Sequence, residues 1–308
     1  MHVGERRTSV TYDIEQADGG YGAALAAGRV CATAGEGARG MISWARRYPG
    51  LYGDANAFDA TLFDTLSLAS AFSGPALPAA DLRMANLLAL WAFALDKAID
   101  RDASTRAEVD AVAARCLAAA KGDAPAPGDE LAHALAGLRD ELAAAPAYSR
   151  LAPVWLEDLE RMLQGMAREW DWASASAQGR SAYPTVAEYL ANADNLGFSF
   201  VLTAHWITGG GEGDVERVRE ASAAVQRVIR VLNDLGTYER DVRTNDLNVL
   251  LLDEDREQVQ QRLAALTGEA RGLIGRMRED EPVLGAYMER QMDFCAGFYG
   301  GADFWGHH

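Results

Sequence analysis

Apolar residues recur at helical spacing along most of this chain, whereas the strict alternation of a half-buried β-strand is nearly absent. Alanine, leucine and arginine, which favour helices, dominate the sequence. Stretches rich in glycine, proline and small polar residues interrupt the pattern at 73–75, 122–128, 174–184 and 209–213, and each is typical of a loop between helices. The sequence therefore predicts an all-α fold.

The segments between these interruptions predict a bundle of nine helices. Their expected ranges are 54–73, 80–97, 105–121, 128–146, 151–172, 184–207, 214–242, 255–278 and 281–305. No long linker and no repeat of fixed period divides the chain. We therefore expect one α-helical domain over residues 21–308, preceded by a flexible N-terminus at residues 1–20.

The charge of the chain argues against two classes of partner. The 308 residues include 29 Lys and Arg against 45 Asp and Glu, a formal net charge of -16 at pH 7. Polyanions and anionic bilayers repel such a chain unless its basic residues gather on one face, and no such cluster stands out. The longest largely apolar run, from Met84 to Leu95, is shorter than the roughly 20 residues of a membrane span. We expect no nucleic-acid partner and no membrane.

The cysteines and the first twenty residues indicate the cellular compartment of the protein. Cys31, Cys116 and Cys295 lie far apart and have no paired spacing, so they predict neither a disulfide framework nor a zinc site. The first twenty residues carry charge and glycine where a secretory signal needs an apolar stretch. We therefore expect a cytoplasmic protein.

Acidic residues follow directly on one strongly apolar helical segment, where a core helix would have none. Asp96 and Asp100 are four residues apart, so on a helix both carboxylates project from one face, about 6 Å apart along the axis. Lys97 points elsewhere. The pair is a candidate metal site. The alternative is that the helix leaves the core here and ends in a solvated polar turn.

A second segment places three oxygen-bearing side chains on successive turns. Asn233, Thr237 and Asp241 follow an apolar stripe at i, i+4 and i+8, each about 40° further round the helix. An amide, a hydroxyl and a carboxylate are hard oxygen ligands. A cation such as Mg²⁺ would complete its octahedron with water and substrate phosphate oxygens.

Two arginines flank this ladder of oxygens. Arg230 lies about one turn before it, and Arg240 immediately precedes its last member, so both could grip an anionic ligand that bridges to the metal. The alternative is an exposed polar face with ordinary pairs four residues apart, such as Arg230 with Asp234.

The string NDLGTYERD resembles the second metal motif of class I terpene synthases, Asn-Asp-x-x-Ser/Thr-x-x-x-Glu, including a basic residue just before the last ligand. The resemblance implies that Asn233, Thr237 and Asp241 bind one Mg²⁺ and that Arg240 contacts a diphosphate. Asp241 stands where the family usually has Glu. Arg230 sits where many members have a further basic residue, and Asn248 also resembles the family pattern.

The segment LWAFALDKAID falls where the family has its aspartate-rich motif, Asp-Asp-x-x-Asp/Glu, on the facing helix. Asp96 matches the first position and Asp100 the fifth, while Lys97 occupies the second. The resemblance implies that Asp96 and Asp100 bind metal, with three Mg²⁺ ions present when diphosphate is bound. The implied catalytic residues are Asp96, Asn233, Thr237 and Asp241.

Residues 184–197 resemble the helix that precedes a kink beside the diphosphate in this family, and Gly197 marks either that kink or tight helix packing. The family's sensor arginine is missing, since Ala193 and Asp194 stand in its place, and the Arg-Tyr pair near the C-terminus is absent as well. The resemblance covers roughly residues 55–305.

Such an enzyme needs a dry, aromatic cavity around the cation. The residues expected to line it are Trp91, Phe93, Gly197, Phe198, Phe298 and Trp305. The alternative for each aromatic residue is ordinary core packing. His205 is assigned no role, because a lone histidine on an apolar face is more often a core residue.

The resemblance implies a carbon–oxygen lyase, a bacterial-type class I diterpene synthase that ionises and cyclises geranylgeranyl diphosphate or a bicyclic copalyl diphosphate. Three alternatives stay open: a sesquiterpene synthase acting on farnesyl diphosphate, a chain-elongating prenyltransferase, and a noncatalytic helical binding protein of the same fold. The oligomeric state is open too, with a homodimer as one option.

Overall fold

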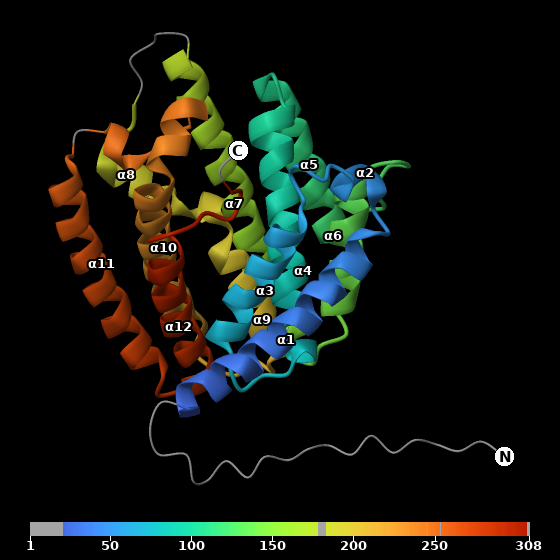
Figure 1. Ribbon diagram of the computed structural model, residues 1–308. Coiled ribbons are helices and arrows are strands. Elements are labelled where there is room, and N and C mark those ends of the chain that lie inside the picture. The colour runs from blue at the N-terminus through green and yellow to red at the C-terminus, as the bar shows by residue number, and fades with distance from the viewer. Residues whose placement is uncertain (1–20, 178–182, 245, 253, 307–308) are drawn as a thin grey trace.

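The structure is a computed structural model that describes residues 21–177, 183–244, 246–252 and 254–306, so the flexible N-terminus expected at residues 1–20 lies outside the described residues. This part of the chain folds into twelve α-helices without a strand, which confirms the all-α prediction (Figure 1). The helices are α1 (Tyr21–Ala45), α2 (Pro49–Tyr52), α3 (Ala60–Ser73), α4 (Ala79–Asp96), α5 (Arg106–Lys121), α6 (Glu130–Leu142), α7 (Tyr148–Ala177), α8 (Val186–Ala191), α9 (Phe198–Thr208), α10 (Val215–Thr244), α11 (Arg256–Met277) and α12 (Pro282–Phe298). A π-helix, η1 (Lys97–Asp102), and two 3₁₀-helices, η2 (Ala193–Leu196) and η3 (Val249–Leu251), complete the set.

Six helices surround the centre of the molecule: α3, α4, α7, α9, α10 and α12. Helix α9 packs between α4 and α7, and α12 lies between α3 and α10. The remaining long helices cover this ring, with α5 and α6 on one side and α11 on the other (Figure 1). One large apolar core, to which every α-helix except α8 contributes buried side chains, joins these layers.

Helix α1 was not among the predicted helices. Its sequence is rich in glycine, which lowers helix propensity, so the local pattern is weak. Packing against α3 and α4 compensates for this weakness. At Gly37 a β-carbon would collide with the side chains of Ser67 and Asn86, so the glycine allows the close approach of these helices.

The single helix predicted over 184–207 is wrong, because the chain breaks there into α8, η2 and α9. Gly197 ends η2 and begins α9 with φ +70°, in the left-handed region that favours glycine. Leu196, Gly197 and Phe198 all line the central cavity described below. The break therefore brings backbone to the cavity wall, where a continuous helix would present only side chains.

Gly197→Ala is expected to destabilise the protein by roughly 2 kcal/mol, because alanine is strained at positive φ and its β-carbon would lie 2.6 Å from Sδ of the buried Met162. Gly268→Ala is the matched control. Gly268 is exposed within α11 and has open space around it, so alanine there should add about 0.5–1 kcal/mol of stability. Chemical denaturation of both variants checks the contrast, and equal effects would contradict it.

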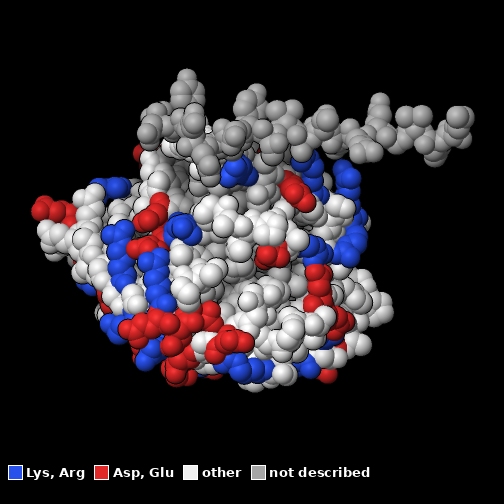
Figure 2. Space-filling model, turned by 90° about the horizontal axis from the view of Figure 1, so that it is seen from below, with Lys and Arg blue, Asp and Glu red and all other residues white. Residues whose placement is uncertain are grey.

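The surface agrees with the low content of basic residues. Figure 2 shows one face on which lysine and arginine side chains alternate with aspartate and glutamate side chains, and acidic residues gather along its lower edge. No helix in the described part of the chain combines the length and hydropathy needed to cross a membrane. Cys31, Cys116 and Cys295 are free thiols.

Candidate active site

A cavity of about 610 Å³ lies inside the ring of helices. Its wall includes Asp96 and Asp100 from one side and Asn233 and Asp241 from the other. These residues come from α4, η1 and α10, which are far apart in the sequence. The two acidic segments singled out in the sequence thus face one shared space rather than bulk solvent on opposite sides of the molecule.

The cavity has a polar end and an apolar end. Near the polar end, the side chain of Tyr299 hydrogen-bonds Asn233. Near the other end, the ring of Tyr287 lies 4.5 Å from that of His205. Tyr287 and Tyr299 are twelve residues apart on and just after α12, which corresponds to roughly 18 Å along a helix. Small and apolar side chains line the space between: Leu66, Ala69, Ala85, Ala89, Val201, Leu202 and Ile229.

The carboxyl groups of Asp96 and Asp100 contact each other through a side-chain hydrogen bond. Burial raises the pKa of Asp96 to about 6, and Glu169 and Asp246 add repulsion. Burial and the charge of Asp96 raise the pKa of Asp100 well above its usual range. The charges of Glu169 and Asp246 act on the same pair, so negative charge gathers near this end of the cavity. Such a pair attracts divalent ions.

The π-helix η1 explains why this pair meets. It begins directly after Asp96 and widens the turn at the end of α4, a feature frequent at functional sites. The same wide turn brings Lys97 Nζ to 2.9 Å from Oδ1 of Asp102, five residues on. Lys97 is thereby paired away from the carboxyl pair. Asp100, Arg101 and Asp102 are exposed, as the alternative of a solvated polar turn expects, but Asp100 and Arg101 also line the cavity.

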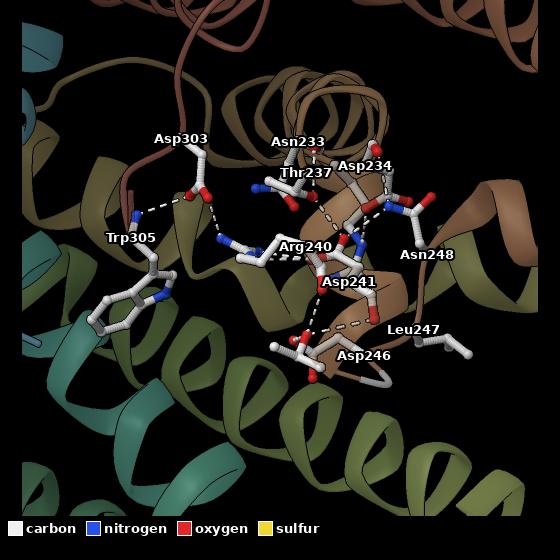
Figure 3. A network of polar contacts seen from close by, with 12 residues as sticks. Asn233, Asp234, Thr237, Arg240, Asp241, Asp246, Leu247, Asn248, Asp303 and Trp305 are labelled. Carbon is white, nitrogen blue, oxygen red and sulfur yellow. Dashed lines mark hydrogen bonds and ion pairs between the residues drawn. The ribbon is translucent and has the colours of Figure 1, made fainter. Parts of the chain in front are cut away.

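On the facing wall, Asn233, Thr237 and Asp241 lie on one side of α10 (Figure 3). The hydroxyl of Thr237 donates to Oδ2 of Asp241 over 2.6 Å, and the amide of Asn248 donates to the same oxygen over 2.8 Å. Thr237 is buried and is held beside the cavity-lining carboxylate of Asp241. The structure thus brings the predicted ladder together and adds Asn248 as its support.

Asp234 has a different part in the same segment. Its carboxylate accepts hydrogen bonds from the hydroxyl of Tyr189 over 2.8 Å and from the backbone of Val249 over 2.9 Å. Burial raises its pKa to about 7. Asp234 therefore ties α8 and η3 to α10, and it fixes the helix that carries the ladder.

Arg240 bridges two carboxylates, as Figure 3 shows. Its Nη2 lies 2.9 Å from Oδ1 of Asp241, and its Nη1 lies 2.6 Å from Oδ2 of Asp303. Asp303 also accepts the backbone N–H of Trp305, whose ring lies under the guanidinium of Arg101 at 4.5 Å. A cation at Asp241 Oδ1 would have to displace Arg240. Sequence patterns gave no signal for Asp303, because it lies in a short irregular segment after α12.

Arg230 is buried and paired on several sides. Its Nη2 lies 2.6 Å from Oε1 of Glu169, its Nε donates to the hydroxyl of Tyr189 over 2.7 Å, and its Nε lies 3.5 Å from Oδ1 of Asp234. The pair of Arg230 with Asp234 thus exists, but both side chains are buried, so the exposed polar face considered as an alternative is wrong. Arg230 lines the cavity and supplies positive charge there, with most of its donors already engaged.

Four of the six expected wall residues line the cavity: Phe93, Gly197, Phe198 and Trp305. The structure corrects the other two. Trp91 is buried behind the wall, where its Nε1 donates to the carbonyl of Leu131 over 2.9 Å. Phe298 packs against Phe304, with ring centroids 4.4 Å apart, and Phe304 takes its place in the wall. The spacing of aromatic residues cannot say which side of a helix wall they face.

The donor set fits Mg²⁺. Carboxylate, amide and hydroxyl oxygens are the ligands that this ion prefers, and it usually keeps water and substrate phosphate oxygens as well. Within the described ranges, no three His, Cys, Asp or Glu side chains come together as a self-sufficient metal site. The oxygens are instead divided between two walls, so a bound phosphate would be needed to complete the coordination between them.

Comparisons with solved structures identify the fold. The chain is similar to 2-methylisoborneol synthase from Streptomyces coelicolor A3(2) in complex with Mg²⁺ and 2-fluoroneryl diphosphate, with a TM-score of 0.69, 17% identity, and coverage of 86% of this chain and 91% of the other. It is also similar to linalool/nerolidol synthase from Streptomyces clavuligerus in complex with 2-fluorogeranyl diphosphate, with a TM-score of 0.68, 18% identity, and coverage of 87% and 97%.

Sequence comparisons agree with the fold. A curated relative, the ent-pimara-9(11),15-diene synthase of Streptomyces sp. (strain KO-3988), is 26% identical over 274 residues, which cover 86% of this chain and 90% of the relative. The family described as "Terpene synthase family 2, C-terminal metal binding" matches residues 88–260, more than half of the chain, and this match includes both acidic segments. The chain therefore belongs to the terpene synthase family and is a terpene synthase enzyme.

Proposed function

We propose that this enzyme is a class I diterpene synthase, which ionises a prenyl diphosphate of twenty carbons and cyclises the resulting cation. The observation that carries the proposal is the arrangement of Asp96 and Asp100 opposite Asn233 and Asp241 across one cavity with an apolar far end. This arrangement holds a charged head group between oxygens at one end and receives a hydrocarbon chain at the other.

The metal would be held by Asp96 and Asp100 on one wall and by Asn233, Thr237 and Asp241 on the other, with three ions when diphosphate is bound. When bound, Mg²⁺ neutralises the charge that develops on the departing diphosphate. Arg240 would turn from Asp241 and Asp303 toward the diphosphate, and Arg230 would add charge from beneath.

The wall supports the rest of the reaction. Phe93, Phe198 and Trp305 present aromatic rings to the cavity, and ring faces stabilise a cation without offering it a nucleophile. Trp305 packs against Phe93 with ring centroids 5.0 Å apart, near the polar end. In the proposed reaction these rings would help to keep water from the cation, which water would otherwise capture early.

The curated relative supports a C20 substrate, because its name designates a diterpene synthase and its identity extends over most of both chains. We therefore propose geranylgeranyl diphosphate or copalyl diphosphate. A shorter substrate is the second candidate, because the two solved structures named above contain analogues of ten-carbon diphosphates. The chain of farnesyl diphosphate is intermediate in length between those of the ten-carbon and twenty-carbon diphosphates.

The decisive experiment incubates purified protein and Mg²⁺ with farnesyl, geranylgeranyl or copalyl diphosphate and analyses the extracts by gas chromatography and mass spectrometry. Cyclic C20 hydrocarbons from either of the two longer substrates are expected. Products from farnesyl diphosphate alone would make the enzyme a sesquiterpene synthase. Elongated diphosphates would indicate a prenyltransferase, and no product with any substrate would favour a binding protein.

Mg²⁺ and inorganic diphosphate together should raise the melting temperature by roughly 5 °C at concentrations near 100 times their dissociation constants. Each alone should have a much smaller effect, because the four carboxyl groups at the polar end repel diphosphate and neither wall alone completes a Mg²⁺ site. Differential scanning fluorimetry with diphosphate and EDTA is the control. Equal stabilisation in EDTA would contradict the metal bridge.

A further inference from the structure

Among the described residues, three arginines line the cavity: Arg101, Arg230 and Arg240. Arg230 and Arg240 are each held by two carboxylates. Arg101 differs from both, because its guanidinium forms no ion pair and no hydrogen bond with another side chain in the described part of the chain. Arg101 is therefore the lining arginine whose N–H groups are still available to a ligand.

Arg101 lies at the polar end of the cavity, beside the acidic pair. It directly follows Asp100 on η1. Burial raises the pKa of Asp96, and the positive charge of Arg101 opposes this rise, so the guanidinium is close enough to act on that carboxyl group. The two carboxyl groups nevertheless hydrogen-bond each other and not Arg101. A cation thus stands where the head group of a substrate would meet the acidic wall, and it is not neutralised by that wall.

The indole ring of Trp305 holds Arg101 in this place. The central carbon of the guanidinium lies over that ring, 4.5 Å from its centroid. Trp305 is itself fixed, because its backbone N–H donates to Asp303 over 2.9 Å and its ring packs against Phe93 with centroids 5.0 Å apart. A contact with a ring face uses one face of the guanidinium and leaves the N–H groups at its edge unoccupied.

Such a guanidinium is suited to a diphosphate. Its planar fork of N–H groups matches two oxygens of a phosphate group and binds them with charge-assisted hydrogen bonds. A side chain that is already held in place loses less conformational freedom when it binds. Arg230 and Arg240 would have to exchange a carboxylate for the phosphate, whereas Arg101 gives up no hydrogen bond to a side chain.

We propose that Arg101 binds the diphosphate of the substrate through its free N–H groups and that Trp305 is the positioning residue that holds it there. This inference rests on the proposed function. Arg101 from the wall of Asp96 and Arg240 from the facing wall would then hold the head group from two sides. The contact strengthens as the carbon–oxygen bond breaks, because negative charge grows on the departing diphosphate.

The test measures the Kd of inorganic diphosphate at saturating Mg²⁺ by isothermal titration calorimetry, and the KM of the prenyl substrate in the product assay. Arg101→Gln removes the charge and the fork, whereas Arg101→Lys keeps the charge alone. Arg243→Gln is the matched control, because Arg243 is exposed on α10, two residues after Asp241, and does not line the cavity. This control removes the same charge without removing a contact with the head group.

Arg101→Gln is expected to raise both Kd and KM about tenfold or more, because charge-assisted hydrogen bonds to phosphate oxygens are lost. Arg101→Lys should raise them about threefold, since an ammonium group cannot reproduce the fork. Arg243→Gln should stay within about twofold of wild type, because salt screens an exposed charge. An unchanged Arg101→Gln variant, or equal losses in Arg101→Gln and Arg243→Gln, would overturn the proposal.

The part of Trp305 is tested by combining variants. Trp305→Leu removes the ring face and should raise the Kd of diphosphate about threefold, but it should add no further loss to Arg101→Gln, because Trp305 acts through Arg101. Trp305→Phe keeps a ring face and should retain most of the wild-type affinity. Losses that add up in the double variant would overturn the positioning role of Trp305.

Circular dichroism identifies a variant that does not fold, and Arg101→Met or Trp305→Met then takes its place. A wild-type enzyme that forms product while Arg101→Gln matches it in Kd and KM would overturn this inference alone. A wild-type protein that neither binds diphosphate with Mg²⁺ nor converts any of the three prenyl diphosphates would overturn the proposed function, and the inference with it.

Discussion

Asn233→Ala is expected to lower turnover below detection, roughly a 10³-fold loss or more, with an unchanged helical circular dichroism spectrum. Asn233 is half-buried in the cavity wall and faces the end where Asp96 and Asp100 lie. In the proposed site its amide oxygen would supply one of the few metal ligands on this wall, and alanine offers none. Because the side chain does not fill the core, its loss should leave the helix intact.

Glu239→Ala is the matched control for this variant. Glu239 lies on the same helix but is exposed and outside the cavity wall, so its replacement should leave turnover within about twofold of wild type. Product formation and the Mg²⁺ dependence of the rate are measured for both variants. Retained activity in Asn233→Ala would remove this residue from the metal site and with it the support for the ladder on α10.

Asp96→Asn should also abolish turnover, and it should stabilise the metal-free protein. The pKa of Asp96 is raised in the folded state, so the wild-type protein loses stability as pH rises from about 4 through about 6, where the folded protein gives up the proton that opposes repulsion from Asp100. Asparagine carries no such charge. Above pH 6 the variant should therefore melt at a higher temperature than wild type when metal is absent.

The same variant should lose most of the stabilisation by Mg²⁺ and diphosphate, because one wall of the proposed metal site would lack a charged ligand. Melting curves from pH 5 to pH 8, with and without both ligands, check the two opposite effects. A variant that is less stable than wild type without metal and yet fully stabilised by the ligands would contradict this account of the carboxyl pair.

Lys97→Ala should be mild. Lys97 pairs with the exposed Asp102, and exposed ion pairs contribute roughly 0–1 kcal/mol. It is directed away from the carboxyl pair, so turnover should stay within about threefold of wild type. An inactive Lys97→Ala variant would mean that this lysine contacts the substrate in a state that the present structure does not show.

Local sequence patterns predicted most of the helices. The helices α3–α7 and α9–α12 correspond to segments whose apolar spacing predicted them, because one apolar face on a helix is a local property. The same patterns missed α1, whose glycines lower its intrinsic propensity, and merged α8 with α9. In both cases contacts with distant helices outweighed the local preference.

The sequence by itself determined which residue types follow each other at helical spacing, and hence the two acidic segments around Asp96 and Asn233 as well as the family to which they point. Only the tertiary structure decided that these segments face each other, that Asp303 holds Arg240, that Trp91 and Phe298 lie outside the wall, and that His205 lies inside it. Periodicity gives the direction of a side chain relative to its own helix. The neighbours of that side chain depend on how all the helices pack together, because helices far apart in the sequence supply the opposite wall.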